Sequence, residues 1–270
     1  MKELLLVAVV LAVAACDVKV NDKGLSLNLG RADATDEWTR SYTIDQGGRL
    51  EIVNANGLIE ATRSDGPRIE VRAERRARAG SQEEAAQLLK RIEMREDVSA
   101  TFVRLEARTA DGATGFRSSF DVRYHISVPD GLGVSFRMAN GDINVENIGG
   151  RIAASTTNGS ITGSGLSGGV EMQSVNGRVQ ADLASVSGDV KLTTVNGAVR
   201  LDLPPDVKAS LDAACVNGGI SIDDVFKVDM RSEESRRRVN ATLNGGGPRI
   251  SASTVNGAVR VRARGARRAD

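Results

Sequence analysis

TVNGAV, at residues 194–199, is the phrase around which this chain is organised, because close variants of it recur along the C-terminal half. The copies are MANGDI (138–143), TTNGSI (156–161), SVNGRV (174–179), TVNGAV (194–199), CVNGGI (215–220) and TVNGAV (254–259). The first five copies follow one another at a nearly constant interval, and such a fixed period is typical of a repeat architecture.

Alternate positions on both sides of each Asn-Gly pair hold apolar or small residues. In the fourth copy these are Val190, Leu192 and Thr194 before the pair and Val199 and Leu201 after it. A period of two is typical of β-strands that bury one face. Each repeat therefore predicts two short strands joined at an Asn-Gly corner.

Two folds are compatible with such strands. An antiparallel meander is one, because Asn-Gly is a strong signal for a hairpin turn of type I′. A β-solenoid is the other, since coils stacked about 4.8 Å apart place like side chains on one another and so explain why whole columns repeat. We predict an all-β protein built on a β-solenoid of about 18–21 residues per coil.

The corner asparagines have two candidate roles. The expected corner residues are Asn56, Asn140, Asn158, Asn176, Asn196, Asn217 and Asn256, the first of which lies in an earlier copy of the pattern near residue 50. In the structural role they accept a left-handed backbone and hydrogen-bond one coil to the next. In the alternative role they form a ladder of amides that binds a glycan. The sequence favours the structural role.

The composition favours an all-β chain and argues against one class of partner. The 270 residues include 29 Gly and only 3% aromatic residues. The 36 basic and 35 acidic residues nearly cancel, so no overall field attracts nucleic acid, and we expect no nucleic-acid partner. The last residues, 265–270, are predicted to be a solvated basic tail.

Residues 1–15 resemble the signal peptide of a bacterial lipoprotein. Their apolar stretch is shorter than the roughly 20 residues that span a bilayer, and VAAC at residues 13–16 matches the lipobox pattern. The resemblance implies cleavage before Cys16 and attachment of lipid, such as palmitate, to it; several acyl chains anchor a protein stably. An ordinary secretory signal with an incidental Cys16 is the alternative. Asp17 resembles an inner-membrane retention signal. We therefore expect a lipid-anchored protein on an extracytoplasmic membrane face of the cell envelope, with the inner membrane favoured.

The part between the signal and the regular repeats predicts several further elements. Residues 16–40 are polar and predict a tether, with an added hairpin as the alternative, before a solenoid domain over 41–264. A helix is predicted over 81–95, because Ser81 and Glu84 form a capping box and an apolar stripe follows. We expect this helix to pack near the N-terminal coils.

The order of the predicted elements along the chain resembles that of a known family. The lipobox, the first Asn-Gly coil at Asn56, the helix, the strand ending in ISVP at 126–129 and the run of Asn-Gly coils are similar to the bacterial putative-adhesin family of β-strand-repeat proteins. The resemblance covers about residues 40–262. It implies a right-handed β-solenoid without catalytic residues. The charged insertion at 223–238 and the Gly-rich turn at 244–248 depart from the pattern, so the last coil is expected to be irregular.

Three groups of residues are candidates for chemistry. His125, the single histidine, has no triad partner that its spacing identifies, and Cys215 is expected to be a buried small side chain. Asp182, Asp202 and Asp223 share one column, six residues past the corner Asn. Stacked carboxylates of this kind are suited to Ca²⁺, although Arg178 and Arg200 can neutralise them.

The sequence therefore predicts no catalysis and no required cofactor. The predicted function is that of a binding, adhesion or scaffold module, attached to the membrane through Cys16, with a protein or glycan as partner. The first alternative is a Ca²⁺-assisted polysaccharide lyase or hydrolase that uses the acidic column. The second is a component of envelope-stress signalling with a membrane partner.

Overall fold

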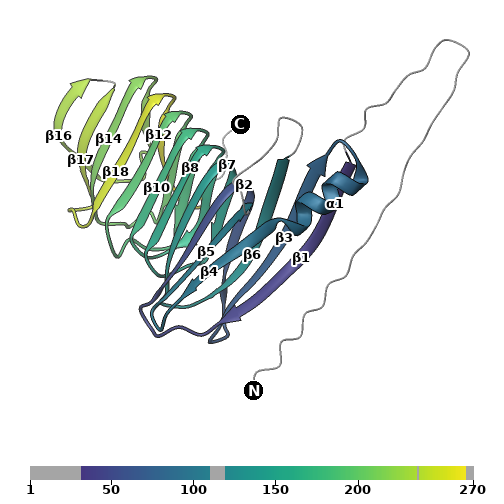
Figure 1. The fold of residues 1–270 in the computed structure, drawn as a ribbon. Coiled ribbons are helices and arrows are strands. Elements are labelled where there is room, and N and C mark those ends of the chain that lie inside the picture. The colour runs from purple at the N-terminus through teal and green to yellow at the C-terminus, as the bar shows by residue number, and fades with distance from the viewer. Residues whose placement is uncertain (1–31, 110–118, 236, 266–270) are drawn as a thin grey trace, which may run out of the picture.

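The computed structural model describes residues 32–109, 119–235 and 237–265. Within these residues the chain forms one helix, α1 (Gln82–Lys90), and strands that belong to one continuous hydrogen-bonded sheet system (Figure 1). The strands are β1 (Ala32–Tyr42), β2 (Arg49–Ser64), β3 (Ile69–Ala79), β4 (Ile92–Val98), β5 (Phe102–Thr109), β6 (Ser119–Pro129), β7 (Gly133–Glu146), β8 (Ile152–Asn158), β9 (Ile161–Leu166), β10 (Val170–Asn176), β11 (Val179–Leu183), β12 (Val190–Asn196), β13 (Val199–Leu203), β14 (Ala209–Asn217), β15 (Ile220–Ile222), β16 (Val228–Ser235), β17 (Arg238–Leu243), β18 (Arg249–Asn256) and β19 (Val259–Ala263).

The strands form two layers that meet at the Asn-Gly corners. Strands before the corner pair in the order β4-β5-β2-β7-β8-β10-β12-β18-β14-β17-β16. Strands after it pair in the order β1-β3-β6-β2-β7-β9-β11-β13-β19-β15. The long strands β2 and β7 run through the corner and belong to both layers.

The repeats stack in parallel and in register. Val190 of β12 lies beside Val170 of β10, and Val199 of β13 lies beside Val179 of β11. The parallel stacking that the repeat period predicts is therefore confirmed, and the antiparallel meander is excluded for these coils. Antiparallel pairing is confined to the two ends of the stack.

The stacking order departs from the sequence order near the C-terminus. β18 lies between β12 and β14, and β19 lies between β13 and β15. The expectation that the coil of Asn217 follows directly on that of Asn196 is therefore wrong, because the coil of Asn256 separates them. The charged insertion at 223–238 contributes β16 to an antiparallel hairpin with β17.

The core lies between the layers and is built from the alternating apolar positions. Ile152, Val170, Val190 and Ile250 stack in one column, and each is almost completely buried. At the corner the coils approach so closely that only glycine fits: a Cβ at Gly177 would lie 1.9 Å from the carbonyl oxygen of the glycine in the neighbouring coil. Close approach explains the Gly of each Asn-Gly pair.

The corner asparagines have ordinary backbone angles. Among the described non-glycine residues only Asn147 and Asn244 have a positive φ, so the expected left-handed backbone at the corner Asn is wrong. The physical reason is that the chain passes from one layer into the other without reversing direction, so no type I′ turn forms.

Two predictions for the N-terminal part are corrected. Residues 32–40, expected in the polar tether, lie in β1, which pairs antiparallel with β3. Helix α1 begins after its N-cap Ser81, whose hydroxyl accepts a hydrogen bond from the Glu84 amide (3.2 Å), but it ends at Lys90 and not near residue 95. Ile92 already belongs to β4, because alternation brings it into the core beside β5.

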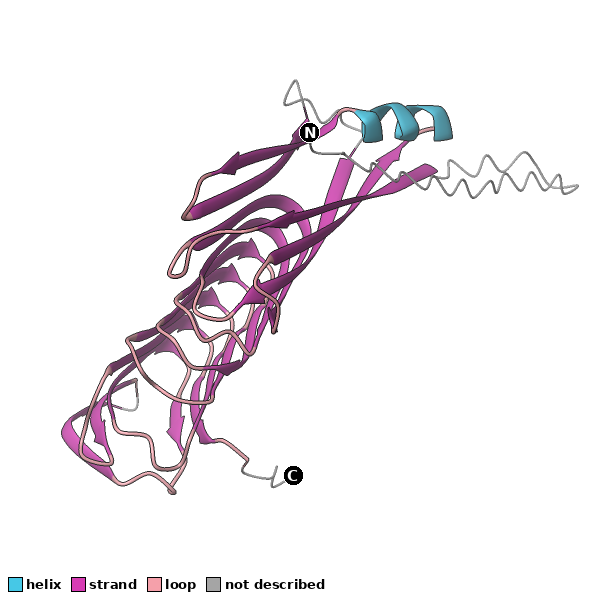
Figure 2. Cartoon of the chain, turned by 90° about the horizontal axis from the view of Figure 1, so that it is seen from below, coloured by secondary structure: helices cyan, strands magenta, loops and turns pink. Residues whose placement is uncertain are grey.

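Helix α1 packs on β1 and β3 through Ala85 and Leu88, at the opposite end of the stack from the C-terminal coils (Figure 2). No helix in the described ranges is long and apolar enough to cross a membrane. Residues 1–15, predicted to be a signal peptide, and Cys16 lie outside the described residues.

Candidate binding ridge

The corner asparagines form one unbroken ladder of side-chain hydrogen bonds. From the second asparagine onward, each Nδ2 donates to the Oδ1 of the asparagine before it in the stack, over 2.7–2.9 Å. The order is Asn56, Asn140, Asn158, Asn176, Asn196, Asn256 and Asn217. Each amide has two N–H groups and two acceptor lone pairs, so the ladder uses half of its capacity and leaves the rest to face solvent.

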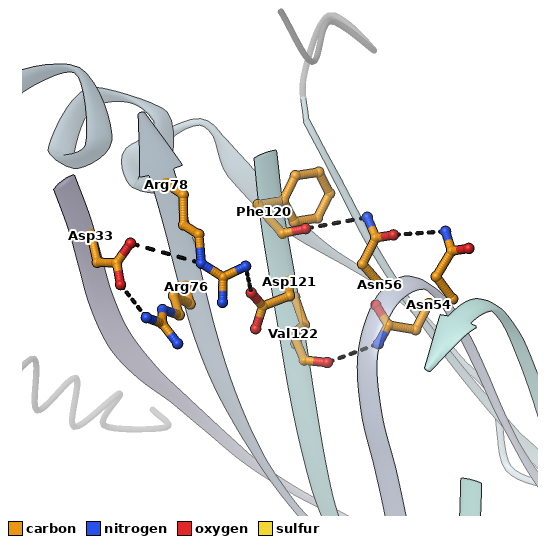
Figure 3. Close-up of polar contacts among 9 residues, drawn as sticks. Asp33, Asn54, Asn56, Arg76, Arg78, Phe120, Asp121 and Val122 are labelled. Carbon is orange, nitrogen blue, oxygen red and sulfur yellow. Dashed lines mark hydrogen bonds and ion pairs between the residues drawn. The ribbon is translucent and has the colours of Figure 1, made fainter. Parts of the chain in front are cut away.

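β6 provides the N-terminal end of the ladder (Figure 3). Asn56 Nδ2 donates to the carbonyl of Phe120 (3.3 Å), and buried Asn54 donates to the carbonyl of Val122 (2.8 Å). Asp121, which lies between these two acceptors, pairs with Arg78 of β3 (2.9 Å). The first rung is thereby fixed to the antiparallel strands at the N-terminal end.

A second ladder runs inside the first. Two residues before the corner, a hydroxyl donates to the carbonyl of the corner glycine in the neighbouring coil, over 2.8–3.1 Å. The donors are Thr156, Ser174, Thr194 and Thr254, and the acceptors are Gly141, Gly159, Gly177 and Gly197. Alternation alone marks this column only as apolar or small; the recurrence of Ser and Thr in it is the signal for the ladder.

Exposed apolar residues flank the Asn ladder on the last four coils. The residue before the corner Asn is Val175, Val195, Val255 or Val216, in stacking order, and these side chains are 38–54% exposed. On the other side of the corner, Ala198 and Ala258 are uncharged, whereas Asp142 and Arg178 occupy the same position on earlier coils. We call the seven corner asparagines, with the residue that precedes each, the corner ridge. It presents amide groups and methyl groups at a spacing of about 4.8 Å.

The acidic column does not form the stack of three carboxylates that a Ca²⁺ site would use. Asp182 and Asp202 are neighbours, but Arg262 follows Asp202 in the stack. Asp182 pairs with Arg264 (2.9 Å) and Asp202 with Arg200 (2.8 Å). The described residues contain no group of three or more His, Cys, Asp or Glu side chains placed to hold a metal ion.

Asp223 has a structural contact of its own. Its Oδ2 accepts a hydrogen bond from the Ala263 amide (2.9 Å), which ties β19 to the residues after β15. The expectation that Asp223 lies on the coil next to Asp202 is wrong, because the intervening coil comes from the C-terminus of the chain.

His125 and Cys215, the remaining candidates, lie apart from the ridge. His125 Nδ1 lies 2.9 Å from Glu60 Oε2, at a depression of about 720 Å³ on the outer face of β1, β3, β6 and β2. Glu60 reaches it from β2, a distant part of the sequence, which is why spacing alone did not identify the partner. Cys215 is buried, in the column of the inner hydroxyl ladder.

Comparisons with known proteins identify a family for this chain. The Toastrack DUF4097 family model matches residues 124–262, more than half of the 270-residue chain. No curated protein matches the chain. Similar solved structures include a putative cell adhesion protein from Clostridium sporogenes, at 10% identity and a TM-score of 0.37, with 84% of this chain and 100% of that chain covered. A putative adhesin from Bacteroides fragilis is similar at 14% identity and a TM-score of 0.43, with coverages of 84% and 96%.

The matched range begins in β6 and ends in β19, so it includes the regular coils from β7 onward and the coil that is out of sequence order. This is the family that the order of the sequence elements resembles. The chain belongs to the Toastrack DUF4097 family.

Proposed function

We propose that this protein is a lipid-anchored, non-catalytic module of the bacterial cell envelope, whose right-handed β-solenoid serves binding, adhesion or scaffolding on an extracytoplasmic membrane face. The observation that carries the proposal is the corner ridge, which is continuous over seven coils and carries no charged side chain. Long regular surfaces of stacked repeats suit contacts along their length. In this arrangement α1 covers the N-terminal end of the stack.

The chemistry of the ridge limits the partner. The amide N–H groups and oxygen lone pairs that the ladder leaves unused can form hydrogen bonds with neutral donors and acceptors, and the valines of the ridge can contact an apolar surface. A protein segment or an uncharged stretch of glycan has both properties, whereas a polyanion would find no cations on the ridge. About a quarter of all residues in the chain are charged, so an uncharged strip of this length is a distinct surface.

The binding test compares two pairs of substitutions on the same two coils. Val195→Asp with Val255→Asp places two charges on the ridge, whereas Thr193→Asp with Ser253→Asp places them on the neighbouring outer face of the layer. Binding of the purified protein to isolated envelope fractions is measured by sedimentation. We expect the ridge pair to weaken binding about tenfold or more and the control pair to leave it unchanged. Equal binding by both pairs would exclude the ridge as the contact surface.

The anchor is tested separately. When cells that express the protein are grown with an alkyne analogue of palmitate, we expect the chain to be labelled and to be found in the membrane fraction. Cys16→Ser should abolish both the labelling and the membrane location. Labelling that persists in Cys16→Ser would show that the lipid is attached at another residue.

A further inference from the structure

The C-terminal coil, residues 249–263, lies inside the stack and not at its end. β18 pairs in parallel with β12 on one side and with β14 on the other, as Figure 1 shows for the yellow strand among green ones. We call the regular coils from β8 to β13 the array. After β13 the chain leaves the array, forms β14 to β17, and then returns, so that its last coil, β18 and β19, lies between the array and β14. We call residues 204–235 and 237–248 the cap.

The coil under the cap is attached to the array by its own hydrogen bonds. The Arg249 amide donates to Asp189 Oδ1 (3.2 Å) at one end of the coil, and the Arg264 amide donates to the carbonyl of Leu203 (2.7 Å) at the other. Between them Thr254 continues the inner hydroxyl ladder. None of these contacts uses a residue of the cap.

In the second layer the contact between the cap and this coil is less extensive than the contacts between array coils, whereas in the first layer β14 pairs with β18 along its length and Asp212 pairs with Arg249 (3.2 Å). Cys215 stands where array coils have Thr or Ser, so the inner hydroxyl ladder ends at Thr254. Strand β15 has three residues, and its Ile220 and Ile222 are only half-buried, whereas Val259 and Val261 of β19 are at most 1% exposed. The second layer of the cap is therefore shorter and less buried than that of the coil beneath it.

Asn244 joins the first and last segments of the cap to each other and so closes the cap as one unit. We call its side-chain hydrogen bonds the clasp. Its Nδ2 donates to the carbonyls of Pro205 (3.0 Å) and Val207 (2.8 Å), in the first segment of the cap. Its Oδ1 accepts the Lys227 amide (3.2 Å). Asn244 itself has a φ of 48° and begins the Gly-rich segment that leads back to the array.

We infer that the cap opens as one unit, and that the coil edge it covers is a docking surface for a second copy of this chain. An open edge of β18 and β19 presents unpaired N–H and C=O groups, which are a template for another strand. The segment that fits them is the β14–β15 coil, which every copy of the chain carries. Exchange of an identical element between two chains is a low-cost route to a dimer.

The corner explains why another copy fits this edge better than an unrelated strand does. A Cβ at Gly218 would lie 1.7 Å from the carbonyl oxygen of Gly257, so the incoming segment needs glycine there. Asn217 donates to Asn256 Oδ1 (2.8 Å), so it also needs an asparagine one residue earlier. The β14–β15 coil supplies both at the required register.

Hydrogen exchange of the full-length protein tests the opening. We expect the amides of β14, β15 and β17 to exchange together with the amides of the C-terminal coil that donate to the cap, such as those of Gly257 and Val259, and about tenfold or more faster than the amides of β12 and β13. Amides of the C-terminal coil that donate to the array, such as that of Arg264, would then be more protected than the amides of β14 and β15, which precede them in the sequence. Equal protection of the cap and the array would overturn the inference.

The docking surface is tested with Asn244→Gly, which preserves the backbone angle and removes the clasp. Asn147→Gly is the matched control, because Asn147 is the other described non-glycine residue with a positive φ and lies far from the cap, in the connection between β7 and β8. We expect Asn244→Gly to speed exchange of the cap and to give a concentration-dependent dimer in analytical ultracentrifugation, and Asn147→Gly to do neither. A monomer with a fast-exchanging cap would refute docking; a cap that exchanges as before would refute the clasp.

Mixed disulfides identify the contact in the dimer. Ala214 and Ser253 are Cα partners across the cap contact. Copies carrying Asn244→Gly with Ala214→Cys are mixed with copies carrying Asn244→Gly with Ser253→Cys, and the control mixture omits Ser253→Cys. A disulfide-linked dimer above the control level is expected, and its absence from a dimeric sample would place the contact elsewhere.

Discussion

Glycine and asparagine have different tasks at each corner of this solenoid. The glycine permits two coils to approach within van der Waals contact, and the asparagine links them through its side chain. Neither residue forms the tight hairpin turn for which Asn-Gly is known, since the backbone at the corner Asn is ordinary. The same dipeptide therefore serves a parallel stack through side-chain geometry and small size.

Gly197→Ala should be strongly destabilising. The added Cβ would lie 2.0 Å from the carbonyl oxygen of Gly177, so two coils must separate, at a cost of about 3 kcal/mol in the free energy of unfolding. Gly169→Ala is the control, because its nearest contact would be 3.6 Å. Urea denaturation measures both, and similar stabilities would contradict the close packing of the corners.

Asn196→Ala should remove two rungs of the ladder. Asn196 donates to Asn176 (2.8 Å) and accepts from Asn256 (2.7 Å), and we expect a loss of about 1–2 kcal/mol with a lower melting temperature. Asn176→Ala should behave in the same way. Unchanged melting of both variants would mean that the ladder contributes no stability.

Two buried tyrosines should make the fold sensitive to alkali. Burial raises the pKa values of Tyr42 and Tyr124 above the ordinary 10.0, and the Glu96 carboxylate adds to the effect at Tyr42. A raised folded-state pKa means that the unfolded chain ionises first, so stability is present below pH 10 and falls as the pH rises above it. Tyr124→Phe should reduce this loss in urea denaturation between pH 8 and 11.

At neutral pH the hydroxyl groups of Tyr42 and Tyr124 should contribute differently to the free energy of unfolding. The Tyr42 hydroxyl donates to Glu96 (2.6 Å), whereas the buried Tyr124 hydroxyl has no partner among the described residues. Tyr42→Phe should therefore cost about 1 kcal/mol, and Tyr124→Phe should be neutral or stabilising. The reverse order would show that the Tyr124 hydroxyl is satisfied in solution.

At the scale of elements, alternation located the strands better than it located their limits. Ser81 and Glu84 specify where α1 begins, but Ile92 satisfies both the helical stripe and the alternation of β4, and pairing with β5 decides between them. The polarity of residues 32–40 suggests a tether because β1 is an edge strand, in which half of the residues face solvent. Local pattern cannot report such long-range pairing.

Deletion of Pro204–Leu243 should leave a folded array. It joins Leu203 to Asn244 and leaves six residues before Ile250, as many as separate Leu183 from Val190. In the shortened chain Asn256 follows Asn196 at the same interval at which Asn196 follows Asn176. Circular dichroism should show cooperative melting of a β protein, and the uncovered edge should make it associate.

A deletion of the same length displaced toward the C-terminus, 214–253, is the control for this variant. It joins the first half of β14 to the end of β18 with the alternation shifted by one residue, so Leu211 and Ala213 would face away from the core and we expect poor folding. Equal folding of both deletions would mean that the C-terminal coil does not sit on β12 and β13.

For the whole molecule, the periodic columns predicted the class of fold and the parallel stacking, because one repeat determines the contacts of the next. They could not predict the order of the last two coils. The alternating residues around Asn217 and those around Asn256 are both compatible with stacking on the coil of Asn196. In the structure the two copies of TVNGAV are direct neighbours, although β14 to β17 separate them in the sequence. The prediction that three carboxylates stack in the acidic column is wrong for the same reason, because Arg262 lies between Asp202 and Asp223 in the stack.

Disulfide trapping between coils tests the parallel, out-of-sequence stack most directly. Thr193 and Ser253 are Cα partners with hydroxyl oxygens 3.4 Å apart, whereas Ala214 pairs with Ser253 and not with Thr193. Under mild oxidation Thr193→Cys with Ser253→Cys should form an intramolecular disulfide in nearly every molecule, and Thr193→Cys with Ala214→Cys should form none. A disulfide in the second pair and none in the first would contradict the stack described here.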